Sequence, residues 1–465
     1  MSRRLFSFLL RCLLCWVALI ACLAGFSLPA RAQFETRATT KLPQGAFAIA
    51  SGDFNNDGFA DVVVIDDNGF TVSLGKGDGT FQKPVFYKNA LSYSLAVGDF
   101  NGDGNLDIVV ANLSPSTVQV YLGRGDGTFR APISSNTTEG SYFVAVGDFN
   151  NDKKADLAII DPPYISVLLG NGNGTFQAPS DNDSFSGAQW LAVGDFNNDH
   201  NLDVIVSGTF GSSYNIGVLL GNGNGTLQDS VNTPVDYVPA TVAVGDLKGD
   251  GNLDAVLGYD LDGIAVFLGN GDGTFQPAVN YDTTGIGNGE VMVTDMNLDG
   301  KMDVVVPSAS RGAEGVDLFW GNGDGTLQLA QFLSAGADTG LPSISDLNGD
   351  GLPDLALANE EAGMIAMLNT GAFSFSPSTP LNFGGPGQQT LRLTNDGTKA
   401  LSISSIKASG PFEVRDTCGS SVRAGGSCDV DVIFKPKGSG TYTGLVTLRD
   451  SASSKPQYVG LSGTN

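Results

Sequence analysis

Residues 99–107 read DFNGDGNLD, an acidic nonapeptide of the form D-x-N-x-D-G-x-x-D. Three carboxylates lie within this one turn, and they repel one another unless a cation lies among them. Oxygen ligands at alternating positions are typical of Ca²⁺ sites. Seven related nonapeptides follow one another at intervals of 46 to 51 residues, and they begin at Asp53, Asp99, Asp148, Asp195, Asp246, Asp295 and Asp346. The sequence therefore predicts a repeated fold that binds calcium.

The period of about 48 residues is typical of the blades of a β-propeller. An apolar segment such as 94–97 precedes each nonapeptide, and a β-branched run such as 62–65 follows it. A third apolar segment ends in a glycine-rich turn, which reads GKGDGTF at 75–81, and a polar fourth segment leads to the next copy. Four antiparallel strands repeated seven times predict an all-β chain with a seven-bladed β-propeller. Residues 34–41 resemble a fourth strand without its first three, so we expect them to pair into the last blade.

The nonapeptide and the glycine-rich turn resemble the FG-GAP/VCBS repeats of integrin α-chain propellers and of bacterial secreted proteins, over residues 34–376. This resemblance implies that side chains at positions 1, 3, 5 and 9 of each nonapeptide hold Ca²⁺, together with the backbone carbonyl at position 7. Alternate side chains of a tight loop converge on one side, which favours the same set. The implied ligands are Asp53, Asn55, Asp57, Phe59, Asp61, Asp99, Asn101, Asp103, Asn105, Asp107, Asp148, Asn150, Asp152, Asp156, Asp195, Asn197, Asp199, Asn201, Asp203, Asp246, Asp250, Asn252, Asp254, Asp295, Asn297, Asp299, Lys301, Asp303, Asp346, Asn348, Asp350, Leu352 and Asp354.

Two of the seven nonapeptides depart from this pattern in ways that disfavour a cation. The third has Lys153 in place of the sixth-position glycine, with Lys154 beside it. A side chain in a left-handed turn costs on the order of 1 kcal/mol, and both ammonium groups oppose Ca²⁺. His200 at the same position of the fourth copy is a milder change, whereas Lys248 replaces the third-position Asn of the fifth copy and can act as an internal counter-ion. We therefore expect up to seven calcium sites of structural importance, with the third and fifth weakest.

The balance of charge excludes several classes of partner and chemistry. The chain contains 25 Lys and Arg against 49 Asp and Glu, and 21 of these acids are the first, fifth and ninth residues of the nonapeptides. Little basic surface is left to neutralise phosphates, so we expect no nucleic-acid partner. The single histidine, His200, argues against His-based zinc sites and against most nucleophiles that need a histidine base.

The first 32 residues have the pattern of a signal peptide. Basic residues 3 and 4 precede an apolar stretch, and the tripeptide Ala-Arg-Ala at 30–32 offers a cleavage site after Ala32. We therefore expect a protein that is secreted or carried on the cell surface. An alternative interpretation takes residues 19–22 as a lipoprotein cleavage box with Cys22 lipidated, and membrane attachment is expected only in that case.

Composition changes near residue 377, which divides the chain into a signal peptide (1–32), a propeller (33–376) and a second domain (377–465). Short alternating segments in the second domain predict an immunoglobulin-like β-sandwich. Its residues 395–398, 425–428 and 434–436 resemble the ASPM/SPD-2/Hydin-type domain of bacterial surface proteins. In an exported chain, the remaining pair Cys418 and Cys428 is expected to form a disulfide.

Antiparallel topology places all nonapeptides on one face of the propeller and connections of variable sequence on the other. A variable face is typical of recognition. Seven aromatic residues near it can contact a glycan or an extracellular protein, or can cap the blade cores instead: Tyr93, Tyr142, Phe143, Trp190, Tyr214, Tyr237 and Tyr259. We therefore hypothesise a binding or adhesion module without catalysis. The alternatives are a structural envelope component, or a polysaccharide-active hydrolase or lyase that uses some of Glu139, Asp181, Asp183, Asp236, Glu290, Glu360 and Glu361.

Overall fold

The computed structural model describes residues 34–41, 46–66, 68–89, 92–211, 213–259, 263–284, 290–308, 315–335, 339–359, 363–369, 373–376, 381–395, 400–423, 425–450 and 457–465. These residues form β-strands, turns and loops, and none of them belongs to a helix. Accordingly, no helix in this described part is long and apolar enough to cross a membrane. The chain divides into two compact units, the propeller unit (Phe34–Thr370) and the sandwich unit (Gly371–Asn465). The predicted signal peptide and Cys22 lie outside the described residues.

The described residues of the propeller unit form seven four-stranded antiparallel sheets. The first six sheets follow the chain, and their strands are β2 (Ala46–Gly52), β3 (Asp61–Asp66), β4 (Gly69–Ser73) and β5 (Val85–Lys88); β6 (Ser92–Gly98), β7 (Asp107–Asn112), β8 (Thr117–Tyr121) and β9 (Ile133–Asn136); β10 (Phe143–Gly147), β11 (Asp156–Asp161), β12 (Tyr164–Leu168) and β13 (Ser180–Asn182); β14 (Ala188–Gly194), β15 (Asp203–Phe210), β16 (Ser213–Leu219) and β17 (Val231–Pro234); β18 (Pro239–Gly245), β19 (Asp254–Tyr259), β20 (Ile264–Phe267) and β21 (Val279–Tyr281); β22 (Met292–Thr294), β23 (Asp303–Ser308), β24 (Gly315–Phe319) and β25 (Gln331–Ser334). The seventh sheet contains β26 (Thr339–Ser345), β27 (Asp354–Asn359), β28 (Gly363–Asn369) and β1 (Phe34–Thr40).

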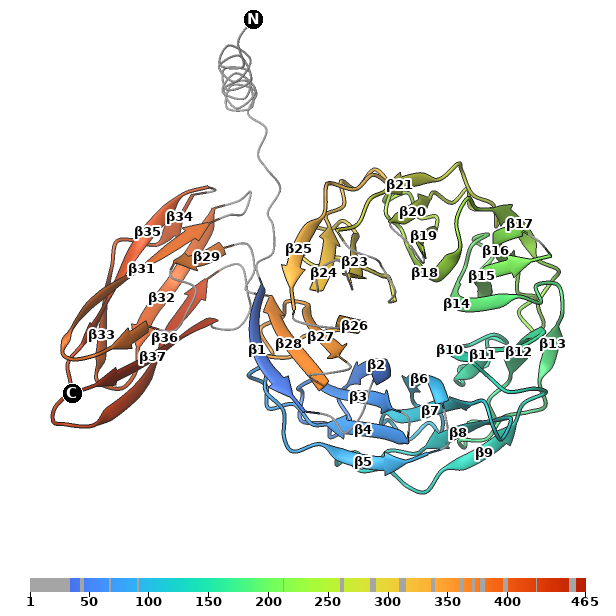
Figure 1. The fold of residues 1–465 in the computed structure, drawn as a ribbon, viewed down its shortest axis with the longest axis horizontal. Coiled ribbons are helices and arrows are strands. Elements are labelled where there is room, and N and C mark those ends of the chain that lie inside the picture. Colours follow the sequence, from blue (N-terminus) through green and yellow to red (C-terminus); the bar gives the residue numbers. More distant parts are fainter. Residues whose placement is uncertain are drawn as a thin grey trace, which may run out of the picture. The chain divides into compact units, whose positions relative to one another are not determined.

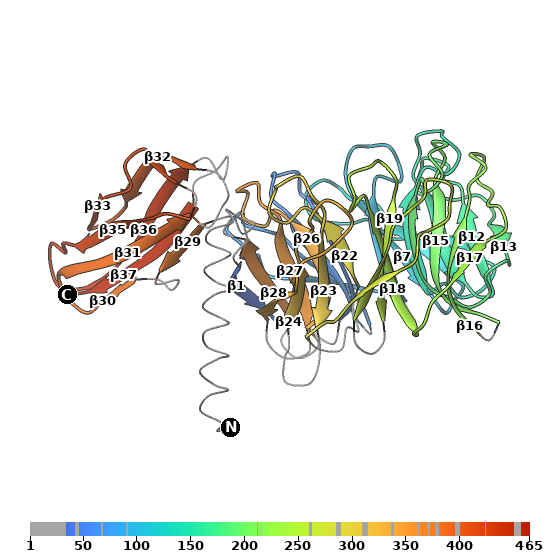
Figure 2. The ribbon, with the colours of Figure 1, turned by 90° about the horizontal axis from the view of Figure 1, so that it is seen from above.

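The sheets follow one another around a ring, with the first strand of each sheet innermost (Figure 1). Seen edge-on, the strands cross the thickness of the ring and the connections gather at its two faces (Figure 2). Each nonapeptide, called an acidic loop from here on, joins the first strand of a sheet to the second. All acidic loops therefore lie on one face, the acidic-loop face, and the first strands begin at the other, the opposite face.

The second strand of each sheet forms the core between neighbouring sheets. All six residues of β7 are buried. Ile108 and Val110 pack against the preceding sheet, whereas Val109 packs against the following one. Because both faces of such a strand are covered, its residues form a continuous β-branched run instead of alternating with polar residues. The fourth strands lie at the rim and are more exposed, as β5 shows.

The N-terminal strand pairs into the last sheet, as the sequence predicts. β1 pairs antiparallel with β28, from Phe34 opposite Asn369 to Thr40 opposite Met364. The N-terminal strand therefore provides the fourth strand of the seventh sheet.

Hydrogen bonds from the glycine-rich turns also link neighbouring sheets. The amide of Gly127 donates to the carbonyl of Phe54 in the preceding acidic loop (2.9 Å), and this bond recurs between later sheets. The amide of Gly79 donates in the same way to the carbonyl of Leu347 (3.3 Å), which connects the first sheet to the seventh. Between the sixth and seventh sheets a side chain replaces the glycine amide as donor. Here the Asn369 side chain donates to the carbonyl of Met296 in the sixth acidic loop (2.7 Å).

The sandwich unit consists of two sheets around an apolar core that includes Leu391, Val430 and Phe434. One sheet has the order β29 (Phe373–Ser376), β31 (Gly387–Asn395), β35 (Ser427–Phe434) and β33 (Phe412–Asp416). The other has the order β30 (Leu381–Phe383), β37 (Gln457–Thr464), β36 (Thr441–Asp450), β32 (Leu401–Ala408) and β34 (Ser421–Val422). This arrangement agrees with the predicted immunoglobulin-like sandwich.

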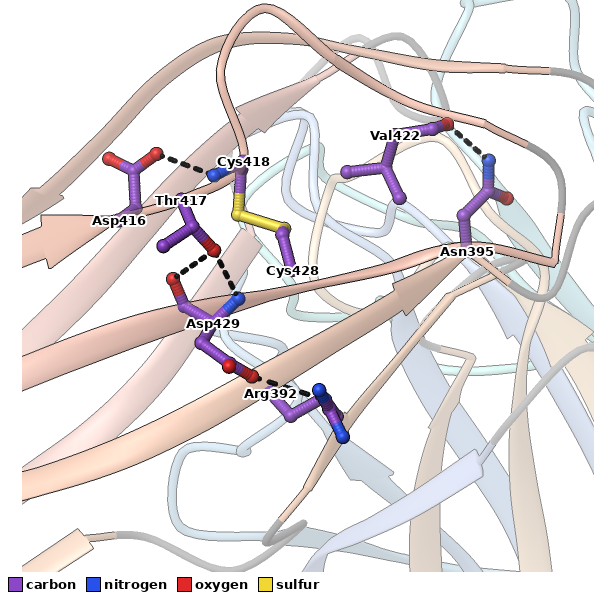
Figure 3. The surroundings of a disulfide bond; sticks show 8 residues. All are labelled: Arg392, Asn395, Asp416, Thr417, Cys418, Val422, Cys428 and Asp429. Atoms are coloured by element: carbon purple, nitrogen blue, oxygen red, sulfur yellow. Dashed lines mark hydrogen bonds and ion pairs between the residues drawn. A yellow bond between two sulfur atoms is a disulfide. The ribbon is translucent and has the colours of Figure 1, made fainter.

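The predicted disulfide is present between Cys418 and Cys428 (Figure 3). Thr417 pairs with Asp429 beside it, because the Thr417 amide donates to the Asp429 carbonyl (2.9 Å) and the Thr417 hydroxyl oxygen accepts from the Asp429 amide (2.9 Å). Arg392 donates to the Asp429 side chain (3.1 Å). The disulfide thus joins the loop after β33 to β35.

The division between the units lies earlier than the sequence predicts. The units separate at 370/371 rather than at 376/377. β29 pairs with β31, with Phe373 opposite Asn395 and Ser376 opposite Arg392. Residues 373–376 therefore belong to the sandwich unit, not to the last blade.

Candidate functional site

The side chains of the first and third residues of an acidic loop converge on the backbone amide of the fifth. In the second loop, Asp99 Oδ1 and Asn101 Oδ1 both accept hydrogen bonds from the amide of Asp103, at 3.2 and 2.8 Å. Asp99 Oδ2 accepts from Gly104 (2.8 Å), and Asp103 Oδ1 accepts from Asn105 (2.9 Å). The same four bonds occur in the first, third, fourth, sixth and seventh loops. The fifth loop has three of them and lacks the bond that a third-position Asn would accept, because Lys248 occupies that position. The structure therefore brings three of the predicted side-chain ligands together.

The ninth residue of each loop has a second role that the sequence analysis missed. The carboxylate of Asp107 is fully buried, and its Oδ2 accepts from the amide of Phe100 (2.9 Å) while its Oδ1 accepts from Gly123 (2.7 Å). It therefore ties its own loop to the glycine-rich turn of the same sheet. The equivalent carboxylates do the same in the other loops: Asp61, Asp156, Asp203, Asp254, Asp303 and Asp354, the last of which accepts from Asn369 where the turn is degraded.

The negative charge of these ninth carboxylates is unfavourable, because they are buried and lie near other carboxylates. The pKa of Asp107 is raised to about 6, chiefly by burial and also by the nearby charges of Asp103 and Asp99, although hydrogen bonds from Gly123 and Phe100 lower it. Burial likewise raises the pKa of Asp303 to about 7 and that of Asp354 to about 8. A cation among the three carboxylates of a loop would relieve this repulsion.

The donor set of the loops fits a hard divalent cation. It consists of carboxylate and amide oxygens, the ligands that Ca²⁺ prefers. Within the described residues, no three His, Cys, Asp or Glu side chains form a cluster arranged to hold a metal ion. Position three supplies an amide oxygen. The carboxylates at positions one and nine each accept backbone hydrogen bonds on both oxygens, as Asp99 and Asp107 do. The side chains at positions 1, 3, 5 and 9 therefore remain the predicted ligands of a cation.

Two positions of each loop have left-handed backbone. At position six, Gly104 has φ = 82°, and the same conformation is kept by Lys153 (66°) and His200 (69°), as the sequence predicts. Position four is also left-handed, as in Asn56 (56°) and Leu298 (55°). The sequence analysis missed this constraint, although Asn or Gly at position four in six of the seven copies gives the signal.

Lysines form ion pairs inside the two loops predicted to be weakest. Lys154 Nζ lies 2.8 Å from Asp152 Oδ2 in the third loop. In the fifth, Lys248 Nζ lies 2.8 Å from Asp250 Oδ2. Each ammonium group therefore already pairs with the fifth-position carboxylate, which a bound cation would otherwise contact.

Neighbouring loops touch through asparagine side chains. Asn56 at position four donates to Asn105 Oδ1 at position seven of the next loop (2.8 Å). The pairs Asn151–Asn201 (3.0 Å) and Asn198–Asn252 (2.9 Å) repeat this contact. Each pair occurs where both positions are Asn, so a comparison of consecutive copies would have predicted it.

The aromatic residues predicted to form a ligand face lie on different surfaces. Tyr93 and Tyr142 are exposed, and their rings stack with centroids 6.3 Å apart. Phe143 and Trp190 are half-buried, and their ring centroids lie 4.2 Å apart. We call these four residues the aromatic cluster. Tyr214 and Tyr237 are exposed but are not in the aromatic cluster. Tyr259 fits the alternative interpretation, because this ring ends β19 and packs into the core, where burial raises its pKa to about 12.

The aromatic cluster borders an open cavity of about 570 Å³ that is lined by residues from the inner edges of all seven sheets. Most of its lining is apolar. Tyr93, Phe143 and Trp190 line it from β6, β10 and β14, close to where these strands begin. Glu290, two residues before β22, lines the cavity from another sheet, and burial raises the pKa of its carboxyl to about 7. In the sequence, Glu290 is one of the acids that a polysaccharide-active enzyme could use, and no sequence pattern connects it with the aromatic cluster.

Comparisons with known proteins match both units. The FG-GAP-like repeat family matches residues 53–110, 99–159, 148–206, 195–257 and 246–306, and the HYDIN/CFA65/VesB-like, Ig-like domain family matches residues 380–464. No curated protein sequence matches the chain.

A comparison with solved structures matches a lectin of Agrocybe aegerita, described as recognising non-reducing terminal N-acetylglucosamine. It is 20% identical, and the alignment covers 68% of this chain and 93% of the lectin, with a TM-score of 0.49. The Tc holotoxin pore of Photorhabdus luminescens is 12% identical over 90% of this chain and 20% of the pore protein, with a TM-score of 0.37.

Proposed function

Because the chain belongs to the FG-GAP-like repeat family and ends in a HYDIN/CFA65/VesB-like, Ig-like domain, we propose that it is an extracellular, calcium-binding propeller that acts as a binding or adhesion module. Its acidic loops hold Ca²⁺ as a structural element on one face. Its ligand, a glycan, binds on the opposite face, where the aromatic cluster lies.

A closed ring of seven blades is part of the proposal. Two observations support it: β1, which precedes the first sheet in the chain, pairs with β28 inside the seventh sheet, and Gly79 of the first sheet donates a hydrogen bond to Leu347 of the seventh. A closed ring leaves no long open sheet edge, and it holds the loops of both faces at fixed positions.

Calcium binding is supported by the oxygen-only donor set of the acidic loops and by their unbalanced charge. In the second loop, Asp99 and Asn101 point oxygens at one amide, next to the carboxylates of Asp103 and Asp107. A divalent cation would neutralise this group and fix the loop. Extracellular modules bind such ions at about 10⁻⁴–10⁻³ M, which suits a structural ion outside the cell. The disulfide Cys418–Cys428 also agrees with an oxidising exterior.

The observation that carries the binding function is the aromatic cluster. Tyr93 and Tyr142 expose 39% and 44% of their surface on a face that is otherwise formed by connections of variable sequence. Large exposed rings that stack on one another present a flat apolar platform with polar tips. Such a platform suits the apolar side of a sugar ring, and an extracellular protein is the alternative ligand.

We propose no catalysis at this site. Hydrolysis of a glycosidic bond requires two carboxyl groups about 5–9 Å apart. Among the described residues that line the cavity, Glu290 is the one carboxylate.

A glycan array probed with the calcium-loaded protein tests the proposal. We expect binding that decreases about tenfold or more in the Tyr142→Ala and Tyr93→Ala variants, because each removes one ring of the stack. Tyr214→Ala is the matched control, since Tyr214 is as exposed as Tyr93 (39%) but lies outside the aromatic cluster. Equal losses in all three variants, or glycan binding that none of them changes, would contradict the assignment of the face.

A further inference from the structure

The cavity at the centre of the propeller unit contains an acid, Glu290, and no described residue that lines this cavity carries a positive charge. Burial is the cause that raises the pKa of Glu290 to about 7, and no hydrogen bond or charge from the described residues offsets it. Among the described residues that line the cavity there is no Lys, Arg or His, and Tyr93 is the other titratable one. When Glu290 is ionised, this described lining therefore supplies no positive charge to compensate it.

The surroundings of Glu290 favour one kind of counter-charge. A metal ion requires several oxygen ligands, but Glu290 is the one carboxylate among the described residues of the lining, and the other side-chain oxygens there are hydroxyls of Ser, Thr and Tyr. An organic cation needs one carboxylate and apolar or aromatic contacts for its body, because π-faces attract cations. Both are present here, so the lining fits an organic cation better than a metal.

The aromatic residues and Glu290 lie at the same end of the cavity. Tyr93, Phe143 and Trp190 occupy the beginnings of β6, β10 and β14, and Glu290 immediately precedes β22. All first strands begin at the opposite face, and Figure 1 shows these strands around the centre of the ring. A ligand that enters from this face would therefore meet three aromatic rings and the carboxylate together.

We propose that the central cavity binds a small organic cation, a primary or quaternary ammonium compound, whose charged group pairs with Glu290 and whose body lies against Tyr93, Phe143 and Trp190. The volume of about 570 Å³ admits such a molecule. This site shares Tyr93 with the proposed glycan platform of Tyr93 and Tyr142, but its charged partner, Glu290, takes no part in glycan binding. Each can fail without the other.

Intrinsic fluorescence offers a direct test. The described residues contain two tryptophans, of which Trp190 lines the cavity while Trp320 is fully buried elsewhere. Choline, Nα-acetyl-lysine amide and the neutral choline isostere 3,3-dimethyl-1-butanol are titrated to about 10 mM at pH 8. We expect a saturable change of emission with at least one cation and none with the isostere. Saturation by choline alone indicates a free quaternary ammonium ligand, and saturation by the lysine derivative alone indicates an ammonium group presented by a side chain.

Three variants sharpen the test. Glu290→Gln should weaken cation binding about tenfold or more, because a charged partner is lost. Glu139→Gln makes the same change at an exposed site and should leave binding unchanged. Trp190→Phe should abolish the fluorescence signal while calorimetry still detects binding. For the wild type, affinity should decrease as the pH falls below about 7, where Glu290 becomes protonated.

The proposal is overturned if neither cation saturates, if the neutral isostere binds equally well, or if Glu290→Gln binds like the wild type. The thermal unfolding of this variant confirms that it is folded, since removal of an uncompensated charge is not expected to destabilise it.

Discussion

Replacement of Glu290 by Gln should stabilise the propeller unit, and the gain should depend on pH in a defined direction. The pKa of Glu290 in the folded protein, about 7, lies above its ordinary value of 4.5 because of burial. Between these two values the folded state binds a proton that the unfolded state has released. The contribution of Glu290 to stability therefore falls as the pH rises through this window, and it is constant above about 7. Glutamine does not titrate, so the free energy of unfolding of the variant does not decrease in this way.

The size of the effect follows from the same two values. A pKa that moves from 4.5 to about 7 corresponds to roughly 3 kcal/mol of free energy of unfolding. This figure is an upper limit, since Glu290 keeps some exposure toward the cavity. The stability difference between Glu290→Gln and wild type should be smallest near pH 4.5, should increase up to pH 7 and should then remain constant.

The assay is calorimetric unfolding of both proteins in excess Ca²⁺ between pH 5 and 8, with the transition of the propeller unit followed separately from that of the sandwich unit. Titration of all other acids is common to both proteins and cancels in the difference. A difference that does not change with pH, or a wild type more stable than the variant at pH 8, would refute the reasoning.

Four further results are expected. Removal of calcium by a chelator should lower the melting temperature of the propeller unit, because three carboxylates per loop are then left facing one another; an unchanged melting temperature together with no metal in elemental analysis would contradict calcium binding. Calorimetric titration with Ca²⁺ should find fewer than seven strong sites. Lys248→Asn should add or strengthen one, because it removes the ion pair with Asp250 and restores the third-position amide. Seven equal sites in the wild type would disprove this ranking. Asp107→Ala should cost roughly 2–6 kcal/mol, because the buried amides of Phe100 and Gly123 lose their acceptor, whereas Asp126→Ala in an exposed turn should cost far less; similar melting temperatures for the two variants would rule out the cross-link. The double replacement of Cys418 and Cys428 by Ser should destabilise the sandwich unit alone, by roughly 2–3 kcal/mol for a separation of 10 residues, and a shift in the propeller transition would contradict two independent units.

The fold was predictable where a local pattern repeats. The acidic loops, the β-branched second strands such as 62–65 and the glycine-rich turns recur in phase, so chance agreement is excluded. Pairing of residues 34–41 into the last sheet was also predictable, since an orphan fourth strand requires three partners. The division between the units was less accessible. Residues 373–375 alternate Phe, Ser and Phe, which suits an edge strand of either unit, and only the pairing of Phe373 with Asn395 decides between them.

The candidate site was predictable only in part. Ligands within one acidic loop are adjacent in sequence, so their convergence follows from the loop itself. The cavity, by contrast, is lined by residues from Ala48 to Ile344, contributed by seven different strands. No local pattern distinguishes Trp190, which lines this cavity, from Tyr259, which packs into the core. Glu290 and the aromatic cluster line the same cavity only because the folded ring brings different sheets together, so the sequence gives no sign of it.

The pairing of β1 with β28 has a consequence for how the chain acquires its shape. Phe34 lies opposite Asn369, so two segments more than 300 residues apart must meet. Contacts of such long sequence separation form slowly. The strand that leaves the ribosome first therefore finds its partner last. Until synthesis has passed residue 369, the growing molecule is an arc with an exposed strand at either end, and chaperones would be needed most during that interval.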